Sequence, residues 1–327
     1  MTGGVSSFDF IQQSTNPRVL GVGGENISLK DQDHNLVLNN PALLNEEMEQ
    51  YASINFVPYF SDIWSSTINY TFNLKQTGLW HVGFQYFNYG SFDSYSEDET
   101  FLGTFKAKDY AFMVSKSHTA NQYTLGASLK FVGSTIGAYN ASAFLFDIGG
   151  TFSHPEKDLT VALAIKNAGI VLGDYSSSSE STTPFDIQMG ISFKPQHMPT
   201  RFSITTHHLH AFDIAFFDPE NNVELDASGN EVEADAPGFG EKLIRHFVVG
   251  TEFIFSDNFQ LRLGYNALRR KELRLDDVSG GAGFSVGFMM RVKAFEFAFT
   301  RAFYHTAGGI SSLGISKNLK SIIKKSN

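Results

Sequence analysis

Metal binding is the first chemistry that the residue types and their spacing in this sequence suggest. His207, His208 and His210 lie close together, and imidazole nitrogens are common zinc ligands. In a strand, however, alternation places His208 and His210 on the face opposite His207. Residues 226–230 resemble part of a calcium loop but lack its regular acidic spacing and the glycine at its sixth position. We therefore expect interfacial histidines and a loop turn, and no metal site.

Four charged residues form a second group, because two short predicted turns bring them into register. The turns place Glu252 opposite Arg262, and Arg291 opposite Glu296. Opposite charges directly across a ladder attract each other, so the four could form a structural brace or a ring that selects a ligand. We favour the brace. No nucleophile or base accompanies them, so the sequence predicts neither a catalytic site nor a cofactor.

The strands that carry these charges show strict alternation, which is clearest between Phe247 and Arg301. Every second residue is apolar, and the residues between are polar or small. A soluble antiparallel sheet would need a second layer over its apolar face, yet no segment resembles a covering helix. An outer-membrane barrel instead turns its apolar side chains toward lipid and its polar side chains toward a lumen. No apolar run reaches the ~20 residues of a membrane helix, whereas barrel strands need only ~9–11.

The predicted strands form an even set of fourteen, as a closed single-chain bacterial barrel requires. Short turns alternate with longer connections at 91–106, 169–184, 212–242 and 271–280. Barrels of this class have short periplasmic turns and long external loops, so both termini are expected on the periplasmic side. We predict an all-β, 14-stranded antiparallel transmembrane barrel over residues 49–327, in the outer membrane and in contact with its lipid. Its strands are expected at 50–60, 63–74, 79–90, 107–117, 122–136, 140–153, 158–168, 185–194, 200–211, 243–256, 258–270, 281–292, 294–304 and 311–319.

Residues 1–48 do not alternate, and we predict that they form a short, partly helical plug in the barrel mouth. Within this segment, Asn40, Pro41 and Ala42 fit a helix start in which asparagine is the cap and proline the first helical residue. Together with Pro17-Arg18, the glycine pairs and the polar run 31–35, this motif resembles the FadL-related outer-membrane proteins. Within that family it is most similar to the PorQ and PorV branch of the type IX secretion system.

The resemblance implies a fourteen-stranded barrel with an N-terminal plug that contains the Asn40-Pro41-Ala42 motif. For the PorQ branch it also implies membership of a cell-surface attachment complex. In that complex the barrel holds a PorZ protein beside PorU and PorV.

Two outer regions are candidates for contact with partners. Arg269, Arg270 and Lys271 are predicted at the outer end of the strand 258–270. There they are either solvated strand-end residues or contacts for lipopolysaccharide phosphates, which arginine binds through paired donors. The 212–242 loop is acidic and contains a few apolar residues that could anchor a partner. We expect contact through Phe216, Phe217, Asp218, Glu220, Glu224 and Phe239.

Two functions remain open: a non-enzymatic anchor for a PorZ-like protein, and a FadL-like channel for hydrophobic small molecules. A channel for such molecules needs an apolar pocket inside the barrel, whereas the predicted lumen is mostly polar, which favours the anchor. The net charge of −9 argues against non-specific nucleic-acid binding. The absence of cysteine excludes disulfides and thiolate metal sites. The residues predicted to face the lumen are Lys130, Lys166, Asp186, Gln188, Ser192, Lys194, Arg201, Ser203, Thr205, Gln260, Arg262 and Glu296.

Overall fold

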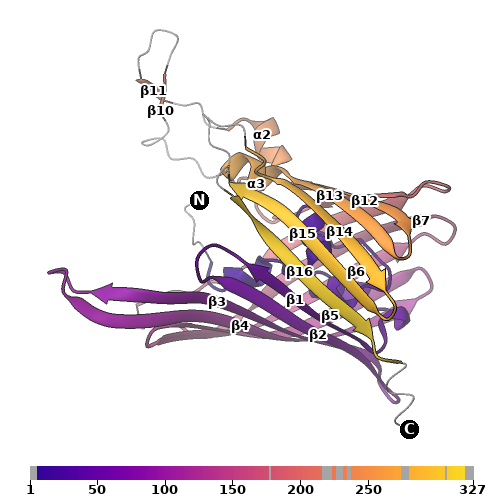
Figure 1. Cartoon of the computed structure of the whole chain (residues 1–327), viewed down its shortest axis with the longest axis horizontal. Coiled ribbons are helices and arrows are strands. Elements are labelled where there is room, and N and C mark those ends of the chain that lie inside the picture. Colours follow the sequence, from indigo (N-terminus) through magenta and orange to yellow (C-terminus); the bar gives the residue numbers. More distant parts are fainter. Residues whose placement is uncertain are drawn as a thin grey trace.

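The chain folds into a closed barrel of antiparallel strands around a filled lumen (Figure 1). The computed structural model describes residues 6–176, 178–215, 223–225, 231–233, 237–273, 280–305 and 308–320. The barrel closes where the first strand pairs with the last, with Tyr51 opposite Asn318. Its fourteen strands are β1 (Tyr51–Pro58), β2 (Trp64–Leu74), β3 (Gly78–Tyr95), β4 (Phe101–Ala120), β5 (Tyr123–Ile136), β6 (Tyr139–Ser153), β7 (Asp158–Gly173), β8 (Asp186–Lys194), β9 (Thr200–Thr206), β12 (Phe247–Ser256), β13 (Phe259–Asn266), β14 (Phe284–Val292), β15 (Phe295–His305) and β16 (Gly308–Asn318).

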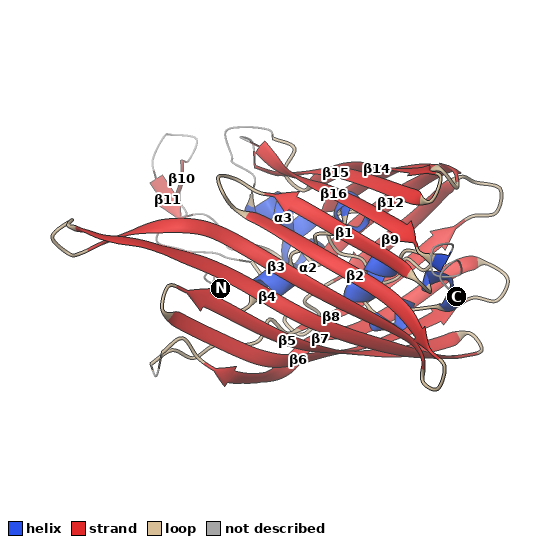
Figure 2. Cartoon of the chain, turned by 60° about the horizontal axis from the view of Figure 1, so that its bottom comes forward, coloured by secondary structure: helices blue, strands red, loops and turns tan. Residues whose placement is uncertain are grey.

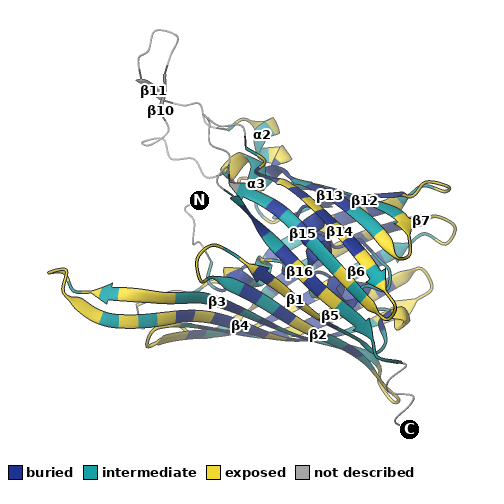
Figure 3. Ribbon diagram, viewed as in Figure 1, coloured by how far each residue is buried: buried dark blue, intermediate teal, exposed yellow. Residues whose placement is uncertain are grey.

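The predicted fold class is confirmed, because parity along each strand separates a lipid face from a lumen face (Figure 3). On β2, Thr67 and Asn69 are buried while Ile68 between them is exposed. On β5, Lys130 is buried and its neighbour Leu129 is exposed. Apolar side chains on the outside suit the hydrocarbon of the bilayer, and closure of the barrel pairs the strand edges within the wall. The described part of the chain contains no helix that is long and apolar enough to cross a membrane.

The segment that precedes β1 lies inside the barrel, where Figure 2 shows its helices surrounded by strands. The segment from Ser6 to Gln50 is therefore a plug. It contains short helical turns whose asparagine and aspartate caps accept hydrogen bonds from the backbone, as these residues typically do at helix starts. The turns are η1 (Asp9–Gln12), α1 (Pro17–Gly21), η2 (His34–Leu38), η3 (Pro41–Leu43) and η4 (Glu46–Met48).

Hydrogen bonds from many strands hold the plug in place. Ser312 Oγ of β16 donates to the carbonyl of Thr15 at 2.7 Å, and Ser192 Oγ of β8 donates to the carbonyl of Ser28 at 2.7 Å. On β4, Ser117 Oγ donates to a third plug carbonyl at 2.8 Å. Short lumen-facing hydroxyls thus satisfy backbone groups of a segment that has little regular structure.

Two strand glycines explain how the Asn40-Pro41-Ala42 motif fits against the wall. A Cβ atom on Gly126 of β5 would lie 2.3 Å from the carbonyl carbon of Pro41. A Cβ on Gly149 of β6 would lie 1.8 Å from Asn40 Oδ1. The motif therefore packs directly on the backbone of β5 and β6, while Asn40 Oδ1 accepts from the amide of Ala42 at 2.9 Å, as predicted for a cap.

The outer ends of β3 and β4 extend into residues 91–106, where the sequence predicted a loop. Most of that range continues the two strands, and only 96–100 turns between them. Residues 91–95 and 101–106 pair with each other, beyond the last pairs of β3 with β2 and of β4 with β5. The result is a two-stranded ribbon that projects beyond the rim (Figure 1). A shift of register between Asn88 and Ser91 interrupts the alternation that would have extended the predicted strand.

Four other predicted strands are too long by several residues at their outer ends, and two of these are the strands predicted at 243–256 and 281–292, which begin only at Phe247 and Phe284. The strand predicted at 200–211 ends at Thr206, and His208 has a positive φ of 56° that an extended strand does not allow. The strand predicted at 258–270 ends at Asn266, whose side chain accepts from the amide of Arg269 at 2.9 Å and begins α3 (Ala267–Glu272). The outer connection between β9 and β12 contains a small hairpin, β10 (Val223–Leu225) and β11 (Glu231–Glu233), and the helix α2 (Phe239–Ile244).

Candidate functional site

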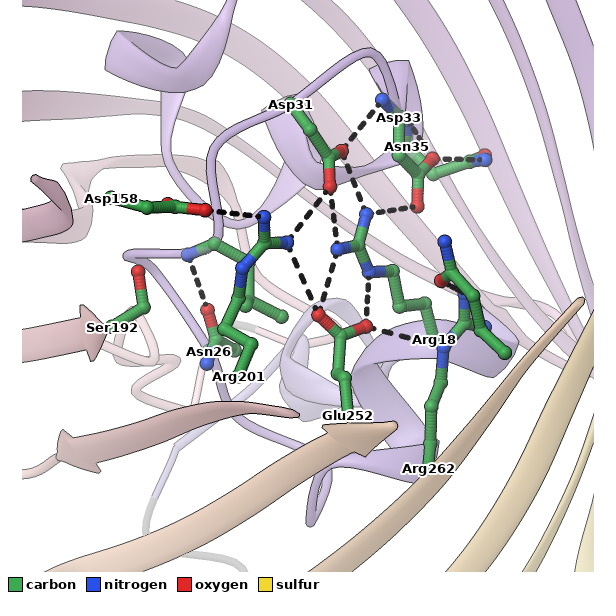
Figure 4. A network of polar contacts seen from close by, with 12 residues as sticks. Arg18, Asn26, Asp31, Asp33, Asn35, Asp158, Ser192, Arg201, Glu252 and Arg262 are labelled. Carbon is green, nitrogen blue, oxygen red and sulfur yellow. Dashed lines mark hydrogen bonds and ion pairs between the residues drawn. The ribbon is translucent and has the colours of Figure 1, made fainter. Parts of the chain in front are cut away.

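A buried cluster of charges joins the plug to the barrel wall (Figure 4). At its centre, Arg18 of α1 donates from Nε and Nη2 to Glu252 of β12 at 2.7 and 2.9 Å. The same guanidinium donates from Nη1 and Nη2 to the two oxygens of Asp31, both at 2.7 Å. Glu252 is only 1% exposed. One arginine side chain of the plug is therefore held by two carboxylates, one from the wall and one from the plug itself.

Two arginines of the wall complete this charge cluster. Arg201 Nη1 lies 3.2 Å from Asp31 and 3.4 Å from Glu252, and Arg262 Nε lies 3.3 Å from Glu252. Burial alone would raise the pKa of Asp31, but Arg18 and Arg201 hold it well below its usual value. Burial would lower the pKa of Arg18, yet Asp31 and Glu252 raise it well above the ordinary arginine value. Asp31 and Arg18 are therefore charged, and the loss of either would leave its partners unpaired in a confined space.

The predicted cross-strand pairs are present, but the central partner was not foreseen. Glu252 lies opposite Arg262, and Arg291 lies opposite Glu296 with an ion pair of 2.9 Å. The strongest contacts of Glu252 nevertheless come from Arg18, which sequence reasoning placed only in a family motif. Parity and turn length fix which strand residues face each other, whereas they carry no information on how a plug is seated. The role of these residues as a brace remains a prediction.

A cavity of about 480 Å³ lies at the other end of the plug, where its first residues meet the wall. Its walls come from η1, from β3, β4 and β5, and from the connection after β7. Phe8 and Phe10 at its floor belong to an apolar cluster that includes Phe87 and Val132. The residues lining this outer pocket are Ser6, Ser7, Phe8, Asp9, Phe10, Tyr89, Phe92, Phe105, Ala107, Asp109, Ser134, Ile136 and Tyr175.

The polar groups of the outer pocket are hydroxyls and carboxylates. The Tyr89 hydroxyl donates to Asp109 Oδ2 at 2.6 Å, and the Tyr175 hydroxyl donates to Ser134 Oγ at 2.6 Å. Asp9 accepts a hydrogen bond from Ser6. Burial raises the pKa of Asp9 and of the Tyr175 hydroxyl from their ordinary values. A concave apolar surface with a few fixed polar groups is the usual form of a small-molecule site.

Below the outer pocket the plug fills the lumen. Gln85 Nε2 donates to the carbonyls of Phe10 and Gln13 at 3.1 and 3.2 Å. Lys130 Nζ pairs with Asp147 at 2.5 Å and donates to Asn167 Oδ1 at 2.8 Å. A pocket between the plug and the wall at this level has a volume of only about 20 Å³. A polar cavity of about 230 Å³ lies near the charge cluster, toward the periplasmic end.

The histidines lie nearer to one another than strand parity predicts, because β9 ends before them. His207 Nδ1 is 2.5 Å from His208 Nδ1, and the rings of His208 and His210 are 5.9 Å apart. His246 binds the carbonyls of His207 and Phe212 through its two ring nitrogens. Among the described residues, no group of three or more histidine, aspartate or glutamate side chains is arranged to hold a metal ion.

The basic run lies on α3, and this corrects its predicted place on a strand. Arg269 lies over the Tyr304 ring at 4.2 Å, and Arg270 donates to the carbonyl of Gly280. Lys271 pairs with Glu241 at 3.1 Å and is the most exposed of the three basic residues. Two of the three side chains are thus used inside the protein, and contact with lipopolysaccharide remains a prediction.

Most of the predicted partner-binding residues lie outside the described part of the chain or have undescribed side chains. Phe216, Phe217, Asp218 and Glu220 fall in the first group, and Glu224 in the second. Phe239 is described: it lies on α2, stacks on Phe212 with ring centres 5.2 Å apart, and is 71% exposed.

The fold is similar to that of solved outer-membrane transporters, although the sequence matches no protein-family model and no curated protein. The P. putida toluene transporter TodX has a TM-score of 0.54 at 12% identity, with 94% of this chain and 99% of that chain covered. The Ralstonia pickettii toluene transporter TbuX has a TM-score of 0.52 at 11% identity, with 94% and 99% covered. A Pseudomonas aeruginosa FadL homologue has a TM-score of 0.50 at 11% identity, with 93% and 98% covered. The chain is therefore an outer-membrane barrel with the FadL-like fold.

Proposed function

We propose that this protein is a non-enzymatic outer-membrane barrel that captures a small hydrophobic molecule in the outer pocket as the first step of its uptake. The observation that carries this proposal is the cavity of about 480 Å³ with phenylalanine walls at the outer end of the plug. Its volume falls in the usual range for small-molecule sites. The likeness to toluene transporters supports the same reading.

The contacts of the plug indicate which part would have to move for a molecule to pass. The first residues of the plug are tied to the wall by a few neutral hydrogen bonds, such as Ser7 N to the carbonyl of Thr182 at 2.9 Å and Gln12 Nε2 to that of Pro184 at 3.0 Å. Arg18, by contrast, is fixed by four charge-assisted bonds. Neutral hydrogen bonds contribute about 1 kcal/mol each and charged ones more. Residues 6–13 would therefore shift while α1 and its cap Asn16 stay in place.

Binding of the hydrophobic dye N-phenyl-1-naphthylamine to the purified barrel tests this function. We expect saturable fluorescence enhancement that is lost when Ala107→Trp fills the outer pocket. Ala127→Trp, on the exposed outer face of β5, is the matched control and should bind dye like the original protein. Equal binding by both variants would place the dye on the detergent-covered surface and refute the proposal.

A second candidate function is the surface anchor, and the filled lumen favours it. Lys130, Asp147 and the plug occupy the region that a hydrophobic path would need, as the predicted polar lumen suggested. The resemblance of residues 17–44 to the PorQ branch adds a PorZ-like partner. Affinity purification from outer membranes separates the two candidates: a stoichiometric surface or periplasmic protein supports the anchor, and a bound hydrophobic molecule supports uptake.

A further inference from the structure

In the part of the chain that the structure describes, the charged side chains that line the outer pocket are all acidic. Among the described residues that line it, Asp9 and Asp109 are carboxylates and none is lysine, arginine or histidine. Asp109 is 6% exposed, and no ion pair reaches it from the described residues. Lys106 and Lys108, its neighbours along β4, are exposed on the other face of the strand. A ligand in this pocket therefore meets two carboxylates and no basic side chain of the described lining; His208, which acts electrostatically on Asp9, lies outside the lining.

Hydroxyl-bearing residues line the pocket around the Asp109 carboxylate. Tyr89 donates to its Oδ2 at 2.6 Å, and Ser134 lies directly opposite Asp109 across the β4–β5 ladder. Ser134 accepts a hydrogen bond from the Tyr175 hydroxyl, and both residues are part of the lining beside the carboxylate. An ionised carboxylate can accept about four hydrogen bonds, which leaves it capacity for a donor from a ligand.

Most of the remaining lining beside the two carboxylates and their hydroxyl partners is apolar. Phe8, Phe10, Phe92, Phe105 and Ile136 enclose the space beside the carboxylate. A molecule with a hydrocarbon body can fill that space, and a donor or a positive charge at one end can reach Asp109. A carboxylate head group in the same place would instead face Asp109 and Asp9, a like-charge contact that specific sites use to reject wrong ligands.

We propose that the outer pocket selects hydrophobic molecules with a cationic or hydrogen-bond-donating head, such as primary amines, and rejects fatty acids and other carboxylates. This specificity rests on the function proposed above. Asp109 is its specificity-determining residue, and Tyr89 is its positioning residue.

Isothermal titration calorimetry at pH 7 tests the proposal with three ligands that share a phenylbutyl group and differ only in the head group: 4-phenylbutylamine, 4-phenylbutanol and 4-phenylbutanoate. We expect the amine to bind most tightly, the alcohol next, and the carboxylate roughly 10- to 100-fold more weakly than the amine, the factor for one hydrogen bond to a charged group. Asp109→Asn should remove the preference for amine over alcohol and leave alcohol binding unchanged. Asp93→Asn, on the exposed ribbon, should preserve all three affinities.

The outcomes distinguish this specificity from the proposed function. Equal binding of amine and carboxylate by the original protein, or an unchanged ratio in Asp109→Asn, would overturn the specificity while alcohol binding still supported the pocket. Absence of binding by all three ligands would overturn the pocket itself. The comparison of three ligands on the original protein decides the question even where Asp109→Asn fails to fold.

Discussion

Replacing Arg18 by methionine is the sharpest test of how the plug is held. The change removes four hydrogen bonds of 2.7–2.9 Å and leaves Glu252 and Asp31 without their main partner. At ~1.5–3 kcal/mol for each bond to a charged group, the gross loss would be ~6–12 kcal/mol. Arg201 and Arg262 remain within 3.2–3.4 Å of the two carboxylates and offset part of it. We therefore expect a cost of about 3–5 kcal/mol, the usual cost of breaking a buried ion pair.

Hydrogen exchange of the α1 amides measures the loss of local stability that Arg18→Met causes in the plug. A loss of 3–5 kcal/mol should speed exchange of these amides by roughly 100- to 1,000-fold or more while the strand amides keep their protection. Arg291→Gln is the matched control. Its pair with Glu296 is about one quarter exposed on each side, so its loss should cost ~1 kcal/mol or less.

A double variant decides whether charge balance is the cause. Glu252→Gln alone leaves Arg18, Arg201 and Arg262 together without their central carboxylate. Combined with Arg18→Met, it should cost less than the sum of the two single changes by ~1–3 kcal/mol, since the two side chains touch. Additive costs, or unchanged exchange in Arg18→Met, would refute the reasoning.

Three further predictions concern the plug and the outer loops. Gly126→Ala should dislodge the Asn40-Pro41-Ala42 turn and speed hydrogen exchange of the plug amides, because the new Cβ would lie 2.3 Å from the carbonyl carbon of Pro41. Gly150→Ala is the control, because its Cβ would meet no atom closer than 3.5 Å and should leave exchange unchanged. Equal effects of the two variants would contradict the close packing. Burial lowers the pKa of His34 to about 4, against the opposing effect of Asp33. The unfolded plug thus binds more protons between pH 6.5 and 4, and acid should destabilise the plug across this window by about 3 kcal/mol, a slope that His34→Gln should flatten. Replacing 212–242 by a tight turn should leave the barrel heat-modifiable on gels and release any surface partner; a partner that stays bound would place the contact in another loop.

The register of the wall could be predicted because it depends on local rules. A two-residue turn at Lys293-Ala294 and strict alternation determine that Arg291 faces Glu296, and nothing distant changes this. The outer ends could not be predicted in the same way. Asn266 ends β13 by capping α3, an event that depends on one side chain and its local backbone.

The seating of the plug depends on contacts far apart in sequence. Arg18 and Glu252 are separated by 234 residues, and a single sequence contains no periodicity that relates them. The outer pocket was missed for a similar reason. Its polar residues come from three strands, β3, β4 and β5, and from Tyr175 in a loop. One side of the pocket is formed by the ribbon of β3 and β4, where the sequence predicted a loop at 91–106. The parity rule correctly placed Lys130, Gln188 and Arg262 inward, but it could not show how much of that space the plug occupies.

The bonds between plug and wall also restrict the order in which the molecule can assemble. The plug contacts β16 through Thr15, β8 through Ser28 and β4 through Leu44, so it touches strands made early and strands made last. Its backbone lies against bare glycine positions that leave no room for a later insertion. We therefore expect the wall to form around a plug that is already in place. The joining of β1 to β16 is then the step that seals the N-terminal segment inside.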